Sequence, residues 1–163
     1  MMHSKVSRVR KIILFSTLVI LVLAGLFFFR SQPLERVLNA DVFAPDGMMG
    51  HVLRHEMTHH SGPMASVRNI DYDPVLFEEI MSLLSLLHVR RALPQRSPSS
   101  DNAAQSYVGF FYIQANSGVT IIQLSSVGSR MYVNGRAYRA NAATQRAVLE
   151  GIWQLLLEIN LLF

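Results

Sequence analysis

The residues His55, Glu56 and His59 form a His-Glu-x-x-His motif, whose residue types and spacing point to a specific chemistry. On an α-helix, two histidines four residues apart lie on the same face, so both imidazoles can bind one Zn²⁺ ion. The glutamate between them can then activate a metal-bound water, as in zinc metallopeptidases. A helix over residues 48–60 would make His55 and His59 ligands and Glu56 the general base.

A zinc site of this kind needs a third protein ligand. The metzincin pattern requires a third histidine where this chain has Ala65, so that pattern does not fit. In the thermolysin-like pattern, the third ligand is a glutamate on a later helix, about twenty residues further on. Glu79 stands at that distance from His59, within a predicted helix. The alternative function is therefore a membrane-bound zinc peptidase in which His55, His59 and Glu79 bind the metal.

The same residues also fit an extended strand, in which the motif cannot form a zinc site. Residues four apart in a strand are separated by about 13 Å, which is too far to share one metal ion. Residues 51–58 alternate between polar and apolar types, Gly62 and Pro63 follow as a turn, and residues 65–70 can pair back. The strand is the interpretation that we favour, with partly exposed histidines, a solvated Glu56, and no metal, cofactor or catalytic residue assigned.

The chain has 163 residues and no cysteine, which excludes disulfides, thiolate metal sites and cysteine nucleophiles. Its net charge is +4, but five of its fifteen basic residues flank a single apolar segment. The ten other basic residues share residues 31–163 with all eleven acidic residues. The excess of positive charge therefore does not indicate nucleic-acid binding.

Residues 12–29 form an uncharged run of 18 residues, IILFSTLVILVLAGLFFF. As a helix this run would be about 27 Å long, close to the thickness of the hydrocarbon core of a bilayer. It ends in three phenylalanines and Arg30 instead of a small-residue cleavage site, so we expect an uncleaved transmembrane helix. More basic residues precede the run than follow it, which predicts a cytoplasmic tail over residues 1–11 and an extracytoplasmic remainder.

The exported part is predicted to be a tether over residues 30–49 followed by an α+β domain over residues 50–163. A helix is expected from Pro74 to near Leu93, capped by Asp73 and stopped by Pro94. A second helix is expected from Asn141 to the end of the chain. Between them, a meander of three or four short strands is predicted, with strand patterns in YVGFFYIQ, VTIIQLSS, RMYV and RAYRA.

The dipeptide Asn134-Gly135 is a strong signal for a two-residue hairpin turn within this meander. A small sheet needs a cover on one face to be stable, and the two amphipathic helices supply it. The predicted fold is thus α+β: a transmembrane helix, then a small antiparallel sheet with two amphipathic helices packed on one face.

Three stretches of this layout, DPVLFEEIMSLL, VGFFYI…VTIIQLS and YVNGRAY, resemble the small extracytoplasmic domains of uncharacterised membrane-anchored proteins of Gram-positive bacteria. The resemblance covers roughly residues 50–160. It implies a hairpin that leads into a helix, a strand meander and a closing helix, displayed at the cell envelope. It carries no catalytic signature.

Three weaker candidates have simpler structural explanations. Arg90, Arg91 and Arg96 could contact anionic lipid or cell-wall polymer, or simply form a solvated helix end. His51, His55, His59 and His60 could sense acid, or be incidental surface residues. Trp153, Phe110, Phe111 and Tyr112 could line a pocket, although packing between a helix and the sheet explains them more simply.

The function predicted from the sequence is a single-pass membrane protein with a non-enzymatic interaction or sensing domain of the bacterial cell envelope. Its partners would be the lipid bilayer, through residues 12–29, and another envelope protein that binds an open edge of the sheet. A further possibility is an accessory subunit of a larger membrane complex.

Overall fold

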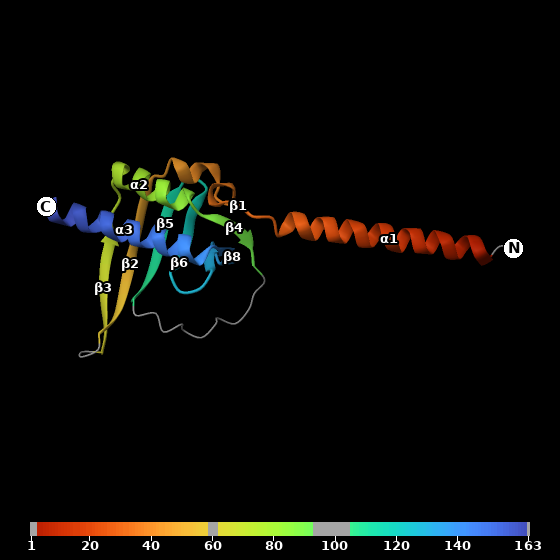
Figure 1. The fold of residues 1–163 in the computed structure, drawn as a ribbon. Helices are drawn as coiled ribbons and strands as arrows, with labels where there is room; N and C mark the ends of the chain where they lie inside the picture. Colours follow the sequence, from red (N-terminus) through yellow and green to blue (C-terminus); the bar gives the residue numbers. More distant parts are fainter. Residues whose placement is uncertain (1–2, 59–61, 93–104, 163) are drawn as a thin grey trace. The chain divides into compact units, whose positions relative to one another are not determined.

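The structure is a computed structural model, and it describes the backbone of residues 3–58, 62–92 and 105–162. Side chains are described for residues 14–26, 29–56, 64–92 and 105–159. The chain divides into two compact units, Met1–Arg30 and Ser31–Phe163. The first unit is a single helix, α1 (His3–Phe28) (Figure 1).

Among the described residues, no helix combines the length and the apolar character that crossing a membrane requires. The predicted anchor over residues 12–29 includes residues 12–13 and 27–28, whose side chains lie outside the described set. The membrane anchor therefore stays a prediction from the sequence.

The second unit is built on one antiparallel sheet, which has eight strands in the described residues. Their order across the sheet is β1-β4-β8-β7-β6-β5-β2-β3. Neighbours along most of the sheet are also neighbours in sequence, so short hairpins connect them. The strands are β1 (Gln32–Pro33), β2 (Gly47–Thr58), β3 (Gly62–Ile70), β4 (His88–Arg91), β5 (Gln105–Ala115), β6 (Gly118–Ser125), β7 (Arg130–Val133) and β8 (Arg136–Ala140).

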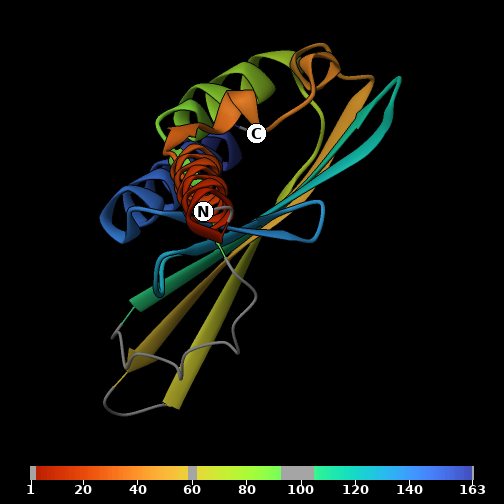
Figure 2. The same cartoon turned by 90° about the vertical axis from the view of Figure 1, so that its right-hand side faces the viewer.

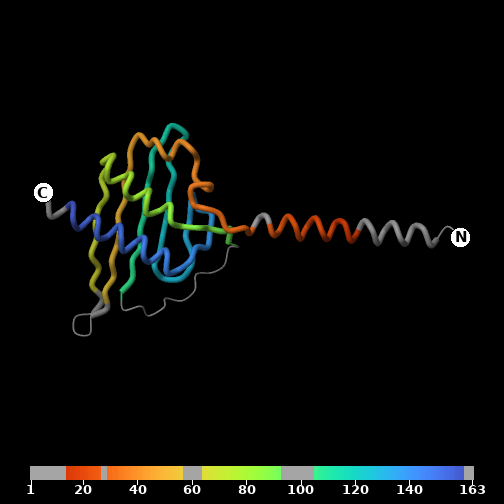
Figure 3. The backbone as a smooth tube through the Cα atoms, turned by 45° about the horizontal axis from the view of Figure 1, so that its top comes forward, coloured from red at the N-terminus to blue at the C-terminus, as the bar shows by residue number. Residues whose placement is uncertain are grey.

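Two helices, α2 (Pro74–Ser85) and α3 (Ala142–Leu162), cover one face of this sheet (Figure 2). They pack against each other, and α3 also contacts β5, β6, β2 and β3 as it crosses the strands (Figure 3). The α+β class and the antiparallel sheet with helices on one face are confirmed. The sheet is larger than the three or four strands and one hairpin that the sequence indicated.

The core lies between the helices and the sheet. The positions of its buried residues follow the period of two residues in the strands and of about 3.6 residues in the helices. Along β5 every second residue from Tyr107 to Ala115 is buried, as expected for a strand with one covered face. On α3, Val148, Ile152 and Leu156 recur at helical spacing and are buried against the strands. Burial of this apolar surface is the main stabilising contribution to the fold.

The end of α2 corrects the predicted helix, which was expected to continue to near Leu93. The helix ends at Ser85, and residues His88–Arg91 form strand β4, which pairs with both β1 and β8. Val89 is fully buried whereas His88 and Arg90 are exposed, so the local period is that of a strand. The strand has only four residues, and alternation over so few residues cannot be distinguished in the sequence from the last turn of an amphipathic helix.

Residues 30–49, predicted to be a tether, are mostly part of the compact unit. They contain β1, two short 3₁₀ helices, η1 (Leu34–Arg36) and η2 (Ala40–Phe43), and the start of β2. Leu34, Leu38 and Val42 are all buried in the core. This segment therefore contributes to the stability of the domain and does not act only as a spacer.

The predicted caps and turn are confirmed. The Asp73 carboxylate accepts a hydrogen bond from the backbone N–H of Leu76 at 2.9 Å, and Pro74 begins α2. The Asn141 side chain accepts bonds from the N–H groups of Ala143 and Thr144, which starts α3. Asn134 and Gly135 have φ of 50° and 75°, the left-handed values that a type I′ hairpin turn requires.

Candidate binding face of the sheet

The strand β2 contains His55 and Glu56, and its side chains alternate between the two faces of the sheet. Arg54 points toward the helices, because its guanidinium carbon lies 5.8 Å from the ring centroid of Trp153 on α3. His55, the next residue, therefore points to the face away from the helices, where it is exposed. The extended backbone over Gly47–Thr58 confirms the predicted strand, and the helix that a zinc site needs is not formed there.

Glu56 lies on the same face as Arg54 and is engaged in two polar contacts. Its carboxylate forms an ion pair with Arg54 and accepts a hydrogen bond from Nε2 of Gln105 at 3.1 Å. The predicted solvated Glu56 is therefore corrected to a half-buried, hydrogen-bonded residue. A carboxylate held in this way links the ends of β2 and β5.

Glu79 lies on α2, where it lines a pocket between α2 and α3 together with Ser82, Leu83 and Glu158. His55 and Glu79 are therefore on opposite sides of the sheet. His59 lies outside the described residues. Within the described ranges, no three histidine, cysteine or carboxylate side chains are grouped closely enough to hold a metal ion. The structure thus does not bring together His55, Glu56 and Glu79.

The face of the sheet opposite the helices carries apolar and aromatic side chains together with polar ones such as Gln114 and Gln123, and neither α2 nor α3 covers it (Figure 2). Four large hydrophobic side chains on this face are more than 40% exposed. They are Met49, Val67, Val119 and Ile121. Exposed apolar patches of this kind mark binding surfaces more often than isolated exposed residues do. We call it the uncovered face and define it by Met49, His51, Leu53, Val67, Val108, Phe110, Tyr112, Val119, Ile121 and Tyr132.

Cross-strand pairing makes the uncovered face continuous. Met49, Tyr112 and Ile121 are direct neighbours across β2, β5 and β6. His51 pairs with Phe110, and their ring centroids are 5.0 Å apart. Such pairs interact directly across a sheet, so the patch is a preformed surface on rigid strands.

The four aromatic residues noted in the sequence divide between the two faces. Phe111 and Trp153 are buried between the sheet and α3, as the packing explanation predicted. Phe110 and Tyr112 lie on the uncovered face and are only partly buried. The alternation along β5 is the signal in the sequence that separates the two pairs.

The strand β3 forms one edge of the sheet, next to the uncovered face. Among the described residues no strand pairs with its outer side. It is nine residues long, and residues 64–67 and 69 are exposed. The opposite edge, β1, has only two residues and contains Pro33, so it offers little for another strand to pair with. The free strand edge is therefore at β3.

Three arginines border the uncovered face at its other end. Arg90 on β4 pairs in register with Arg139 on β8, and Arg139 pairs with Arg130 on β7. Their neighbours Val89, Ala140 and Met131 are buried under the helices, so the arginines point to the uncovered side. We call Arg90, Arg139 and Arg130 the arginine row.

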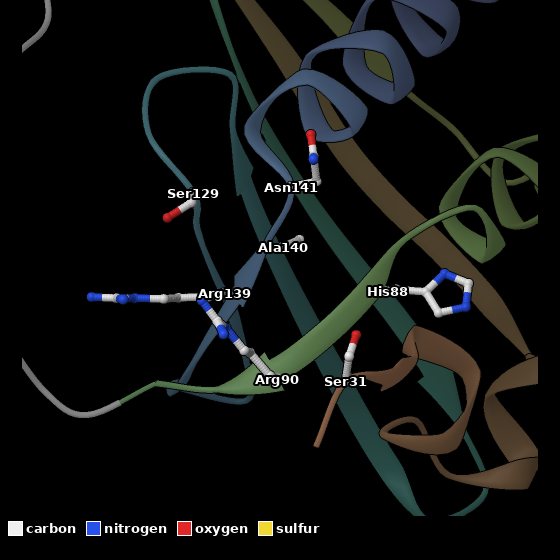
Figure 4. Close-up of a pocket in the computed structure, with 7 residues that line it drawn as sticks. All are labelled: Ser31, His88, Arg90, Ser129, Arg139, Ala140 and Asn141. Carbon is white, nitrogen blue, oxygen red and sulfur yellow. The ribbon is translucent and has the colours of Figure 1, made fainter. Parts of the chain in front are cut away.

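A pocket of about 360 Å³ lies beside the arginine row. Figure 4 shows arginine side chains from β4 and β8, Asn141 at the start of α3, His88 at the start of β4, and Ser31 just before β1. The complete set of lining residues is Ser31, His88, Arg90, Ser129, Arg139, Ala140 and Asn141. Of the three arginines named as a basic patch or a solvated helix end, Arg90 and Arg91 lie on opposite faces of strand β4 and not at a helix end, and Arg96 is outside the described residues.

Sequence reasoning missed Ser129, Arg130 and Arg139, although a signal for two of them exists. A two-residue turn at Asn134-Gly135 fixes the hairpin register, and counting outward from it places Arg130 opposite Arg139. The pairing of Arg90 with Arg139 gives no such signal, because β4 joins the sheet far along the chain from β8.

Two groups near these surfaces have shifted pKa values. Burial raises the pKa of Tyr107, which lies under α3, and the nearby Arg54 charge partly opposes this shift. A hydrogen bond from the Ser117 side chain is the main cause that lowers the pKa of Asp41 below its usual value of 3.8, and desolvation acts in the opposite direction. Asp41 also accepts a bond from the backbone N–H of Ser117 at 3.1 Å, which links η2 to the β5–β6 turn.

Comparisons with protein-family models, with curated proteins and with solved structures found no match to this chain.

Proposed function

We propose that the chain is a single-pass membrane protein that displays a non-enzymatic binding domain outside the membrane. Its partner would be another protein of the cell envelope. The observation that carries the proposal is the continuity of the uncovered face with the free edge of β3. Together they offer backbone hydrogen-bonding groups beside an exposed apolar surface, which is the combination that strand addition uses.

The geometry of the edge specifies what the partner segment would look like. An extended segment added to β3 would place every second side chain on the uncovered face, next to Val67. Val67 is 53% exposed, and its cross-strand neighbour Leu53 is in turn paired with Val108. We expect the partner segment to carry apolar residues at alternate positions. Their side chains would then continue the line of apolar side chains formed by Val67, Leu53 and Val108.

The membrane anchor is supported by α1 itself. Its side chains from Leu14 to Leu26 are exposed, apart from Gly25, and most of them are apolar. A helix that is apolar on all sides is stable when it is surrounded by protein or by lipid. Protease treatment of intact cells tests the orientation: a C-terminal tag should be digested, and a protected tag would contradict an extracytoplasmic domain.

Site-specific photo-crosslinking in the native membrane tests the binding surface. A photoreactive amino acid in place of Val67 should give a defined crosslinked species with a second protein. The matched control places the same amino acid at Glu78, which is exposed on α2 in the helix layer. Identical products from both positions, or uncrosslinked monomer from both, would argue against binding at β3.

A further inference from the structure

The helices α2 and α3 lie side by side and leave a groove of about 380 Å³ between them (Figure 1). Along each helix the lining positions are three or four residues apart, so one face of α2 and one face of α3 form the two walls. The lining residues are Glu79, Ser82, Leu83, Gly151, Gln154, Leu155 and Glu158.

The groove has an apolar floor and a polar rim. Leu83, Gly151 and Leu155 are half-buried, and the two leucines pack against the core. The other four lining residues are polar and exposed. Grooves of this composition bind amphipathic helices, whose apolar side chains recur at the same spacing of three and four residues.

Gly151 leaves room on the floor of the groove. Glycine inside a helix is less favourable than alanine, because it loses more conformational freedom on folding. The packing of α2 on α3 does not require glycine here, since a Cβ atom at this position would lie 3.4 Å from Cδ1 and Cδ2 of Leu83, an ordinary van der Waals contact. A longer side chain at this lining position would occupy part of the groove. The glycine therefore provides space for an apolar group of an occupant.

The charge of the groove is negative. Glu79 and Glu158 stand on opposite walls, and none of the seven lining residues is basic. Neither carboxylate forms an ion pair with a described residue. No basic residue stands in the last turn of α2 or of α3, where the negative end of the helix dipole favours a cation. The complementary occupant therefore carries positive charge.

We propose that this groove binds a basic amphipathic helix of a partner protein. The apolar side chains of that helix would lie on Leu83, Gly151 and Leu155, and its lysine or arginine side chains would pair with Glu79 and Glu158. Burial of the apolar floor supplies affinity, whereas ion pairs at the rim mainly set partner choice and association rate. The groove is on the helix side of the sheet, so this proposal does not depend on strand addition at β3.

Fluorescence anisotropy with labelled model peptides tests the groove, using the full chain in phosphatidylcholine nanodiscs. The probe is a helical peptide of about 14 residues, or about four turns, with leucines on one face and lysines on the flanks. In one comparison peptide glutamate replaces the lysines, and in the other alanine replaces the leucines. Empty nanodiscs give the adsorption of each peptide to lipid. We expect saturable binding to the protein for the leucine–lysine peptide only.

Variants of the lining residues assign this binding to the groove. Glu79→Gln and Glu158→Gln should each weaken it about two- to fivefold, the effect of losing one exposed ion pair. Glu78→Gln is the matched control, because Glu78 is exposed on the same helix but does not line the groove. Gly151→Met should weaken binding about tenfold or more, because its side chain fills the floor. Its thermal unfolding midpoint should be unchanged or higher, since methionine is the better helix former.

Several results would overturn the proposal. Equal binding of the lysine and glutamate peptides, or no saturable binding, would exclude recognition of a basic helix. Equal binding of the leucine and alanine peptides would mean that only charge is recognised, as for a polyamine. A loss in Glu78→Gln as large as that in Glu79→Gln, or unchanged binding in a folded Gly151→Met variant, would place the contact outside the groove.

Discussion

Arg54 on β2 and Trp153 on α3 are in contact across the interface between sheet and helix, with 5.8 Å between the guanidinium carbon and the ring centroid. Arg68 on β3 lies at the same distance from this ring. Trp153 is 2% exposed, so the two arginines enclose a buried aromatic residue. The contact fixes which side of β2 faces the helices and therefore which side carries His51 and His55.

Trp153→Ala should destabilise the domain by about 3–5 kcal/mol, because it removes a large buried ring and leaves a cavity. Trp153→Phe should cost less, because it keeps an aromatic ring and removes an indole N–H without a hydrogen-bond partner among the described residues. Urea denaturation followed by circular dichroism measures both. Equal losses for the two variants would mean that the ring does not pack as the structure describes.

Gly50→Ala should destabilise the domain by about 1–3 kcal/mol through a steric clash. A Cβ atom at this position would lie 2.5 Å from the carbonyl oxygen of Phe110 on the paired strand. Gly47→Ala is the control in the same strand, because its Cβ atom would meet no atom within 4 Å. Thermal unfolding should show a lower midpoint only for Gly50→Ala, and a matching decrease at Gly47 would contradict this explanation.

Asp41 should make stability depend on pH at the acid end. Its pKa is lowered by the Ser117 hydrogen bond, so its contribution is present above 3.8 and is lost as the pH falls through the folded-state pKa. Carboxyl ¹³C chemical shifts should give a titration midpoint below 3.8 for Asp41. In Ser117→Ala the midpoint should move upward, and an unchanged midpoint would exclude the hydroxyl as the main cause.

The elements with local signals could be predicted from the sequence. Asp73 with Pro74, the dipeptide Asn134-Gly135, and Asn141 each encode their structure through hydrogen bonds or φ angles within a few residues. The alternation along β2 was also sufficient to favour a strand over a helix for the His-Glu-x-x-His segment. In each case the physical cause lies within one turn or one strand.

The features that depend on long-range pairing could not be predicted in this way. Val89 belongs to β4 because it pairs with Ala140, some fifty residues away, and nothing near Val89 encodes that partner. The burial of Leu34 likewise depends on contacts of η1 with α2. The arginine row combines both cases, since the hairpin supplies two of its members locally and β4 supplies the third only through tertiary structure.

The positions of His55 and Glu79 lead to a prediction about metal binding. Ligand atoms of one Zn²⁺ ion each lie about 2 Å from the metal, so they must be within about 4 Å of each other. A sheet with helices packed on one face separates these two side chains by far more than that, because layers pack about 10 Å apart. Glu79→Gln should therefore leave the zinc content of the purified full chain unchanged, whatever the effect of His55→Ala.

Elemental analysis by mass spectrometry after dialysis against zinc measures this, with Glu78→Gln as the control on the same helix. Stoichiometric zinc that is lost in both His55→Ala and Glu79→Gln, but kept in Glu78→Gln, would require the two residues to meet. Such a result would contradict the placement of β2 and α2 on which the uncovered face depends. Zinc that responds to His55 alone would be bound on the uncovered face without a ligand from the helix layer.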